Sequence, residues 1–203
     1  PSLVEEGIEI LRRSWRGEAV NFSGKRFEVG DLQVTPVPES TPKIYLGGMV
    51  EPAIQRAARV ADGFLCTGGI GIDLYNEALE QQGKSIQDGD IILGCWAIIA
   101  EDPEAEAAKI GEHVLYQINE YIKWGAFGPP ESTPLFEDHA VAIENGLYEL
   151  WDADTAVTEL NKLLAVYPNI RDIHFWAQFP GEPVESGDVR LRYIAEQVLP
   201  RLG

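Results

Sequence analysis

Two pairs of adjacent glycines follow apolar, extended runs of the sequence. Gly47 and Gly48 end the run KIYLGG, and Gly68 and Gly69 end the run DGFLCTGG. Glycine lets an anion approach backbone N–H groups closely, and a helix beginning near Pro52 would direct the positive end of its dipole to the first pair. These features are typical of a phosphate site. Glycines after strands are also ordinary tight turns, and the pattern alone leaves both interpretations open.

Neighbouring side chains extend or limit this candidate anion site. Thr67 precedes the second glycine pair and adds a hydroxyl donor. Arg56 and Arg59 fall more than one turn beyond the expected start of the helix, where the dipole no longer acts. We therefore expect these two arginines on a solvated face and leave them out of the site.

The run DIHFWAQF alternates polar and apolar residues near the C-terminus. His174, Trp176 and Gln178 share one face of the expected strand, and Ile173 and Phe175 share the other. We expect the polar set at the mouth of a barrel interior, where a histidine can donate a proton. A hydrogen-bonded structural histidine is the alternative, and Trp176 also fits a packed core.

The remaining reactive residue types indicate no site. Cys66 and Cys95 lie inside apolar strand patterns without neighbouring charge, so we expect reduced, buried thiols rather than a nucleophile or a disulfide. His113 and His139 lack the partner spacing that a metal site requires, and we predict no metal.

Strands and helices are expected to alternate along most of the chain. A helix over residues 2–16 precedes an extended, hairpin-like excursion over residues 17–38. Four strands then appear in the runs KIYLGG, DGFLCTGG, IILGCWAIIA and DIHFWAQF. Helices are expected after each strand, with Asp73, Asp102 and Asp154 as N-caps, and a long loop is expected over residues 125–150.

Near-continuous apolar strands that alternate with helices indicate an α/β protein with a parallel sheet. Four β-α units are half of a TIM-type (β/α)8 barrel, which typically takes about 250 residues. We therefore predict one partial-barrel domain over residues 1–203. A small, open, doubly wound sheet is the alternative, but it needs helices on both of its faces.

Composition limits the possible partners. The chain has 203 residues and a formal net charge of −17, with 33 acidic and 16 basic residues, which opposes binding to nucleic acid or to anionic lipid. No run approaches the roughly 20 apolar residues of a membrane helix. We expect a cytoplasmic protein, and the absence of a starting methionine is expected if the chain is a piece of a longer protein.

The order of several segments resembles the luciferase-like monooxygenases, which include deazaflavin (F420)-dependent relatives. The segments are EEGIEILRRSWRGEAVNFSGKRFEV, PKIYLGGMVEPAIQRAARVADGF, NEALEQQGK, EDPEAEA and YIAEQVLPRLG. The likeness spans nearly the whole chain. It implies the C-terminal half of a TIM-type barrel, without the first four strands that carry most acid/base groups of the family.

The resemblance implies a cofactor site built around the glycines. It places Gly47, Gly48 and Met49 against the ribityl phosphate of FMN or F420, with Thr67 and Gly68 beside them. His174 or Gln178 would lie near the ring, and no catalytic acid or base is identified. The implied activity is a flavin- or F420-dependent oxidation or monooxygenation of a small organic substrate.

The rival hypothesis is a non-catalytic half-barrel that acts as a self-associating scaffold. Four strands leave two unpaired edges and an uncovered apolar face. We therefore expect either a homodimer or pairing with a separate N-terminal half.

Overall fold

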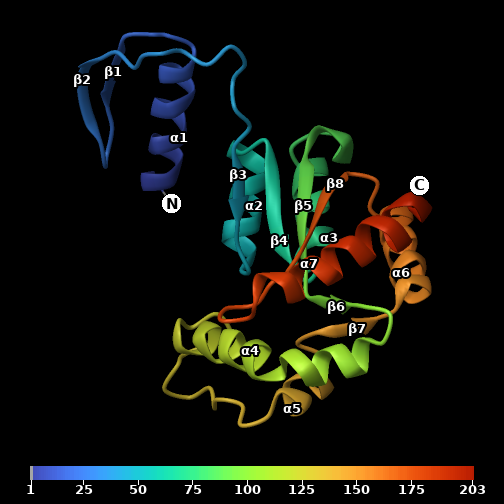
Figure 1. The fold of residues 1–203 in the computed structure, drawn as a ribbon. Helices are drawn as coiled ribbons and strands as arrows, with labels where there is room; N and C mark the ends of the chain where they lie inside the picture. The colour runs from blue at the N-terminus through green and yellow to red at the C-terminus, as the bar shows by residue number, and fades with distance from the viewer. Residues whose placement is uncertain (1) are drawn as a thin grey trace. The chain divides into compact units, whose positions relative to one another are not determined.

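The computed structural model describes residues 2–203, which form two compact units (Figure 1). The first unit contains the described residues up to Leu93 together with Asn169–Asp172, and the second contains Gly94–Pro168 and Ile173–Gly203. One partial-barrel domain over residues 1–203 stays a prediction.

The first unit begins with a helix that holds a hairpin. Helix α1 (Ser2–Trp15) precedes the antiparallel strands β1 (Val20–Ser23) and β2 (Glu28–Leu32). The Glu6 carboxylate of α1 accepts hydrogen bonds from three consecutive backbone N–H groups, those of residues 25–27, at 3.1, 2.8 and 3.0 Å. These three hydrogen bonds hold the turn between β1 and β2 against α1. The hairpin lies within the predicted extended excursion.

A four-stranded sheet with the spatial order β3-β4-β5-β8 follows the hairpin. Its strands are β3 (Tyr45–Gly47), β4 (Gly63–Thr67), β5 (Asp90–Cys95) and β8 (Ile170–Phe175). Strands β3 and β4 are parallel, with Tyr45 opposite Gly63 and Gly47 opposite Leu65. Helices α2 (Glu51–Val60) and α3 (Ile72–Glu80) follow β3 and β4, and a short 3-10 turn (Ile86–Asp88) precedes β5. The pairs β3–α2 and β4–α3 are the first two β-α units expected from the sequence.

The two faces of β4 differ in burial. Phe64 and Cys66 are buried, whereas Leu65 and Thr67 between and after them are exposed. The ring of Phe64 stacks on Tyr75 of α3 with a centroid distance of 5.2 Å. The buried apolar residues of this unit include Ile54, Ala57, Ala58, Ile72, Ala78, Leu79, Ile91 and Leu93. The face of β4 that carries Phe64 and Cys66 therefore packs against the helices, and the face that carries Leu65 and Thr67 does not.

The amino ends of the strands are joined through one carboxylate. Asp90 of β5 accepts hydrogen bonds from Lys43 Nζ at 2.5 Å, from the Tyr45 hydroxyl at 2.9 Å and from Arg171 Nη1 at 3.1 Å. Burial opposes ionisation of Asp90, but the hydrogen bonds from these three donors outweigh it and hold its pKa below the ordinary value. Strands β3, β5 and β8 thus share one electrostatic anchor.

The second unit is mainly helical. Its strands are β6 (Ala97–Ile99) and β7 (Glu149–Trp151), which pair in parallel. Its helices are α4 (Pro103–Lys123), α5 (His139–Glu144), α6 (Ala153–Val166) and α7 (Val184–Tyr193), with a π-helical segment (Ile194–Val198) and a 3-10 turn (Leu199–Arg201) at the end. Helix α5 and the start of β7 lie within the long loop expected over residues 125–150.

Two apolar clusters stabilise the second unit. One contains buried residues of β6, α4 and α5, the residue before β7 and a residue after β8: Ile98, Ala107, Ile110, Val114, Ile118, Ile122, Ala142, Tyr148 and Phe179. The other lies between β6, α6 and the C-terminal segment and contains Ala97, Ile99, Ala156, Leu160, Ile194 and Val198. Successive residues of β6 therefore point into different clusters, which explains why this short strand is buried throughout.

Three sequence predictions were wrong in detail. The expected third strand is not continuous, because the Trp96 carbonyl accepts the Glu149 N–H at 2.9 Å and the chain enters the separate β6–β7 ladder. Helix α3 is capped by Gly71, at φ +83°, rather than by Asp73, which lies inside the first turn. Helix α6 is capped by Asp152, which accepts the Thr155 N–H at 2.8 Å.

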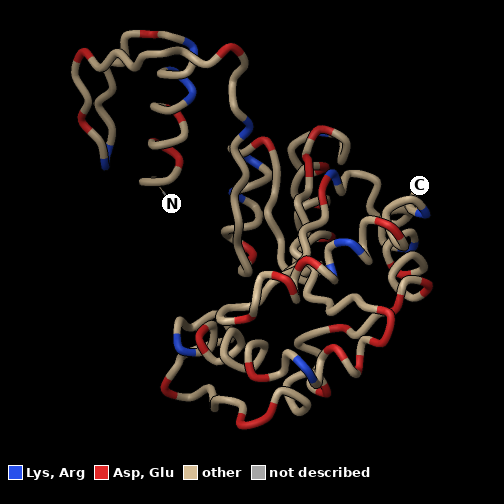
Figure 2. Tube along the Cα trace, viewed as in Figure 1, with Lys and Arg blue, Asp and Glu red and all other residues tan. Residues whose placement is uncertain are grey.

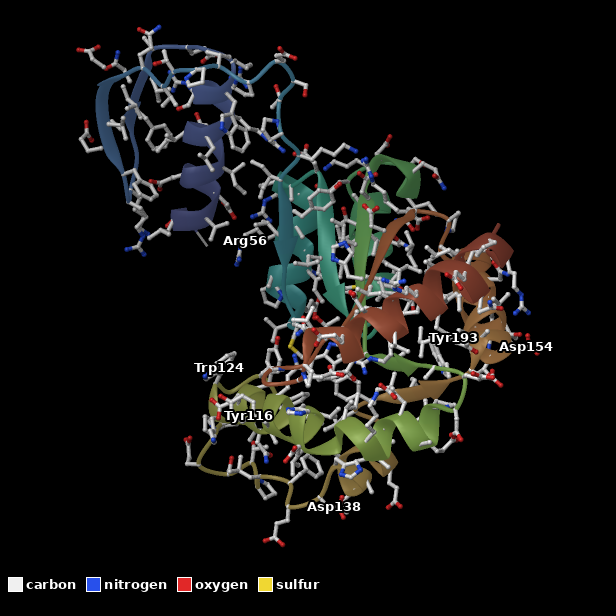
Figure 3. All side chains as sticks on the ribbon, in the orientation of Figure 1. Arg56, Tyr116, Trp124, Asp138, Asp154 and Tyr193 are labelled. Carbon is white, nitrogen blue, oxygen red and sulfur yellow. The ribbon has the colours of Figure 1, made fainter. Side chains whose placement is uncertain are left out.

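The residue expected to cap α6, Asp154, instead accepts a hydrogen bond from Arg201 at 2.7 Å and is labelled in Figure 3. The remaining predicted cap is correct: Asp102 accepts the Ala105 N–H at 2.9 Å at the start of α4. Within residues 2–203, no helix has both the length and the apolar character that crossing a membrane demands.

Candidate cofactor site

The two glycine pairs lie at the same edge of the sheet. Because β3 and β4 run in parallel with Gly47 opposite Leu65, the loops that follow them leave the sheet side by side. The first loop contains Gly48 and Met49, and the second contains Gly68 and Gly69. The structure thus brings together all five residues predicted for the cofactor phosphate, Gly47, Gly48, Met49, Thr67 and Gly68.

Gly48 is required by the packing of α2. A Cβ atom at this position would lie 2.5 Å from the Cβ of Ala53, inside the first turn of the helix. A Cβ at Gly47 would meet only the Leu65 carbonyl oxygen, at 3.4 Å. A tight turn is therefore enough to explain the glycine at position 48. The absence of a side chain there lets the first turn of α2 pack directly against the end of β3.

The second loop is different, because its glycines face open space. Gly68 has φ +59° and Gly69 has φ +76°, and a Cβ at either position would have no neighbour within 4 Å. The left-handed conformation favours glycine, but nothing in the described residues fills the room beside it. The backbone of this loop is therefore open to the approach of another group.

Backbone donors are available at this edge. Among residues 2–203, the backbone hydrogen bonds outside helices and strands include none donated by the N–H groups of Gly48, Met49 or Gly68. At the start of α2, the N–H groups of Ala53 and Ile54 both point to the Val50 carbonyl, at 2.9 and 3.1 Å. An anion at this edge would therefore be bound by loop N–H groups rather than by the first turn of α2.

Charged side chains near α2 do not add a cation to the edge. Arg56, labelled in Figure 3, lies 3.7 Å from the Glu5 carboxylate of α1, and Arg59 forms an ion pair with the same carboxylate. Arg59 is exposed, as expected, whereas the Arg56 side chain is only 19% exposed, so the solvated face predicted for both holds for Arg59 alone, and their exclusion from the site stays a prediction. Glu51 in the first turn of α2 accepts a hydrogen bond from Gln55 at 2.9 Å, and its negative charge opposes an anion at the positive end of the helix.

Apolar side chains surround the glycines. Met49, Val50, Leu65 and Ile70 are 55%, 63%, 46% and 49% exposed, respectively. All four belong to β4 or to the two loops after β3 and β4. The carboxyl edge therefore combines loop backbone N–H groups with exposed apolar side chains, a composition that suits a phosphorylated ring compound.

The last strand is shorter than predicted: β8 ends at Phe175, and Trp176 and Gln178 follow it outside the strand. His174, Trp176 and Gln178 are exposed, whereas Ile173 and Phe175 pack against the second apolar cluster. Gln178 donates a hydrogen bond to the Glu182 carbonyl at 3.2 Å. Trp176 stands edge-on to Tyr121. The exposed set remains available to a ligand, and its placement near a cofactor ring stays a prediction.

The thiols and the other histidines have structural surroundings. Burial raises the pKa of the Cys66 thiol to about 11 and that of Cys95 to about 12, so neither is a nucleophile near neutral pH. His113 Nδ1 lies 3.1 Å from the Pro180 carbonyl oxygen, and His139 packs against Gly111 of α4. Within residues 2–203, no group of three or more metal-ligating side chains is arranged to hold an ion.

Two groups of residues have no signal in the sequence. One is an ion network in the second unit, in which Arg190 binds Glu106 at 2.5 Å and Glu182 at 2.6 Å. The other is a group of aromatic rings centred on Tyr121 and Trp96. Both join residues that lie far apart in the chain, so neither periodicity nor short motifs could reveal them.

Known proteins share sequence similarity with much of this chain. A family model described as luciferase-like monooxygenase matches residues 2–158. An F420-dependent glucose-6-phosphate dehydrogenase of Mycobacterium avium (strain 104) is 31% identical over 111 residues, which are 52% of this chain and 33% of that protein.

Solved structures share the fold. The coenzyme F420-dependent tetrahydromethanopterin reductase of Methanopyrus kandleri superposes with a TM-score of 0.69 at 19% identity, covering 100% of this chain and 63% of that one. The oxygenating constituent of 3,6-diketocamphane monooxygenase from Pseudomonas putida, in complex with FMN, has a TM-score of 0.66 at 15% identity, covering 99% and 63%. The chain thus spans less than two thirds of the length of each of these proteins.

These likenesses confirm the predicted α/β fold as part of a luciferase-like TIM-type barrel. The family match covers most of the chain and includes both glycine loops. The chain therefore belongs to the luciferase-like monooxygenase family.

Proposed function

We propose that this chain supplies the phosphate-binding wall of a flavin- or F420-dependent oxidoreductase of luciferase-like type. The observation that carries the proposal is the open loop at Gly68 and Gly69 beside the Gly48–Met49 loop, where N–H groups without backbone acceptors meet unfilled space. The names of the relatives, F420-dependent and FMN-bound enzymes, support either cofactor.

The residues of the site have distinct roles in this proposal. The N–H groups of Gly48, Met49 and Gly68 donate hydrogen bonds to phosphate oxygens, and the Thr67 hydroxyl adds a further donor. Gly47 keeps the strand end free of a side chain, and Met49 covers the ribityl side. When bound, a reduced flavin or F420 supplies the hydride or the oxygen chemistry itself.

Titration with FMN and with riboflavin, which lacks the phosphate, tests the site. We expect FMN to bind more tightly than riboflavin, because the wall recognises the phosphate. The variant Gly68→Asp places a carboxylate beside it. Two like charges about 5 Å apart at an effective dielectric constant of about 20 repel by about 3 kcal/mol, so FMN binding should weaken at least about 100-fold.

A matched control separates this charge effect from backbone strain. Gly83 also has a left-handed backbone, with φ +71°, and open space around its Cβ position. Gly83→Asp should leave FMN affinity unchanged, whereas riboflavin affinity should change with neither variant. Equal losses in the two variants would contradict the proposal. Gly48→Asp is less informative, because its side chain would collide with Ala53.

The second candidate function is a self-associating scaffold without turnover. The exposed apolar residues Met49, Val50, Leu65 and Ile70 favour some covering partner. We propose a second copy or an N-terminal half-barrel in that role, with a small organic substrate and a cytoplasmic location for the whole enzyme. Failure of the wild type to bind FMN at high micromolar concentration, together with self-association in sedimentation equilibrium, would favour the scaffold.

A further inference from the structure

Aromatic side chains gather on one surface of the second unit. Tyr121 of α4 lies 5.4 Å from Trp96, between ring centroids, and both rings are partly buried. Three further rings rest on these two and are exposed: Trp124 by 72%, Phe127 by 39% and Trp176 by 36%. We refer to Trp124, Phe127 and Trp176 as the aromatic surface.

The rings meet edge to face. Trp124 stands at 71° to Tyr121 with a centroid distance of 5.6 Å, and Trp176 stands at 70° to Tyr121 at 6.3 Å. Phe127 stands at 88° to Trp96 at 6.0 Å. Each outer ring is therefore fixed by its edge contact while much of its own surface stays in water. Each outer ring therefore offers exposed aromatic surface on which a planar molecule can stack.

The base of this group is rigid. Trp96 also contacts Tyr148, with centroids 5.1 Å apart, and Tyr148 contacts Phe179 at 5.6 Å. Tyr148 is 2% exposed and donates its hydroxyl hydrogen to Gln117 at 2.6 Å. The inner rings that the outer rings contact are therefore packed against buried residues, one of which is hydrogen-bonded, and this packing orients the outer rings in the absence of a ligand.

The segment that begins with Trp124 and Phe127 is acidic. Residues 124–152 contain six acidic residues and neither lysine nor arginine, as Figure 2 shows along the trace. The nearest cation in sequence, Lys123, is engaged with Glu120 at 2.6 Å. A negatively charged ligand would meet repulsion without a free countercharge, whereas an uncharged ring would meet none.

The size of the surface fits a small molecule better than a second copy of the chain. With side-chain areas of about 200 to 250 Å², the exposed fractions of the three rings leave about 350 Å² of aromatic surface. A stable protein interface needs about 800 Å² on each partner. The aromatic surface is less than half of that, which is the scale of a small-molecule contact rather than of a protein interface.

We propose that Trp124, Phe127 and Trp176 form a binding surface for uncharged, planar aromatic small molecules. The inference depends only on the second unit and holds whether or not the proposed phosphate wall in the first unit is correct. It goes beyond that proposal, because it assigns a ligand class from residues that take no part in phosphate binding.

The test uses 2-naphthol, which is uncharged at pH 7, and the indole N–H signals of the protein in ¹⁵N-edited NMR spectra. We expect the signals of Trp124 and Trp176 to shift on titration, while those of Trp15 and Trp151 stay in place. In Trp124→Ala the affinity for 2-naphthol should fall at least about tenfold, because the most exposed ring of the surface is removed.

Two controls make the result decisive. Tyr116, labelled with Trp124 in Figure 3, is a 56% exposed aromatic residue of the same helix outside the ring group, so Tyr116→Ala should bind 2-naphthol normally. 2-Naphthoate, which has the same rings and a negative charge, should bind several-fold more weakly. The variant Trp176→Ala should also weaken binding of 2-naphthol.

Several outcomes would overturn the proposal. These are the absence of indole shifts at millimolar 2-naphthol, equal losses in Trp124→Ala and Tyr116→Ala, and tighter binding of 2-naphthoate than of 2-naphthol. Indole shifts that follow protein concentration in the absence of any ligand would assign the surface to a second copy of the chain instead.

Discussion

Replacement of Arg190 by methionine should strongly destabilise the second unit. The Arg190 side chain is 3% exposed, and it binds Glu182 at 2.6 Å, Glu106 at 2.5 Å and the Ala177 carbonyl at 2.7 Å. Glu182 is 1% exposed and also accepts the Phe179 N–H at 3.0 Å. The guanidinium therefore joins α7 to α4 and to the segment that follows β8.

The magnitude follows from the charge that is left behind. Methionine fills much of the arginine volume, so the packing loss is small compared with the loss of the ion pairs. Removing one partner of a buried ion pair costs about 3 to 5 kcal/mol, because the remaining charge is buried without compensation. We expect the free energy of unfolding of Arg190→Met to fall by that amount at pH 7, in urea denaturation followed by near-ultraviolet circular dichroism.

The effect should depend on pH in a defined direction. Burial alone would raise the pKa of Glu182, but the hydrogen bonds from Arg190 and the Phe179 N–H outweigh it and hold the pKa below its ordinary value. In the wild type, Glu182 thus adds stability above the pKa of its unfolded state and loses that contribution as the pH falls. In Arg190→Met burial dominates and the folded-state pKa rises, so acid relieves the variant. The stability difference should therefore shrink as the pH is lowered from 7 towards about 4.5.

Arg192 provides the matched control. It lies on the same helix and is exposed, so Arg192→Met should change stability by less than about 0.5 kcal/mol. The double variant Arg190→Met, Glu182→Gln should recover part of the loss, because it removes the buried charge. The reasoning is refuted if Arg190→Met and Arg192→Met are equally stable, or if the difference between wild type and Arg190→Met is the same at pH 7 and pH 4.5.

Three further predictions concern the first unit and the thiols. Glu6→Gln should speed hydrogen exchange of the amides of residues 25–27, because these N–H groups lose their carboxylate acceptor. The same hydrogen bonds hold the pKa of Glu6 below its ordinary value despite desolvation, so the wild type should lose this protection as acid protonates Glu6. Unchanged exchange in the variant would count against this contact. Cys66 is buried and Cys95 is partly buried, and desolvation raises their pKa values to about 11 and about 12, so both should react slowly with a thiol reagent at pH 8 until the protein is denatured. Rapid reaction in the folded protein would contradict these raised pKa values. Glu51→Gln should tighten FMN binding about two- to fivefold by removing a like charge at the start of α2, and weaker binding would place the phosphate elsewhere.

Local signals in the sequence predicted the elements well. Asp102 and Pro103 mark the start of α4 because a capping carboxylate and a fixed φ act within one turn. Caps were misplaced where two acidic residues compete, as at Asp152 and Asp154, because either carboxylate suits the first turn of a helix. The break at Trp96 was not predictable, since it depends on pairing with a strand about 50 residues away.

The candidate site was predictable only in part. The meeting of Gly48 and Gly68 follows from two parallel strands, whose carboxyl ends share an edge. The sequence does not show why each position is a glycine, because this depends on three-dimensional packing. Gly48 packs closely against α2, whereas open space surrounds Gly68. The ring group and the Arg190 network depend on side chains from separate helices and strands, and no spacing rule connects those.

The Asp90 anchor has a consequence for how such a sheet can diversify. Its three donors hold strands β3, β5 and β8 in register at their amino ends, on the side away from the glycine loops. Sequence change in those loops can therefore proceed without loosening the strands beneath them. Related proteins can therefore differ in the loops at the carboxyl ends of these strands, and in the ligand those loops bind, while keeping the Asp90 hydrogen bonds at the amino ends.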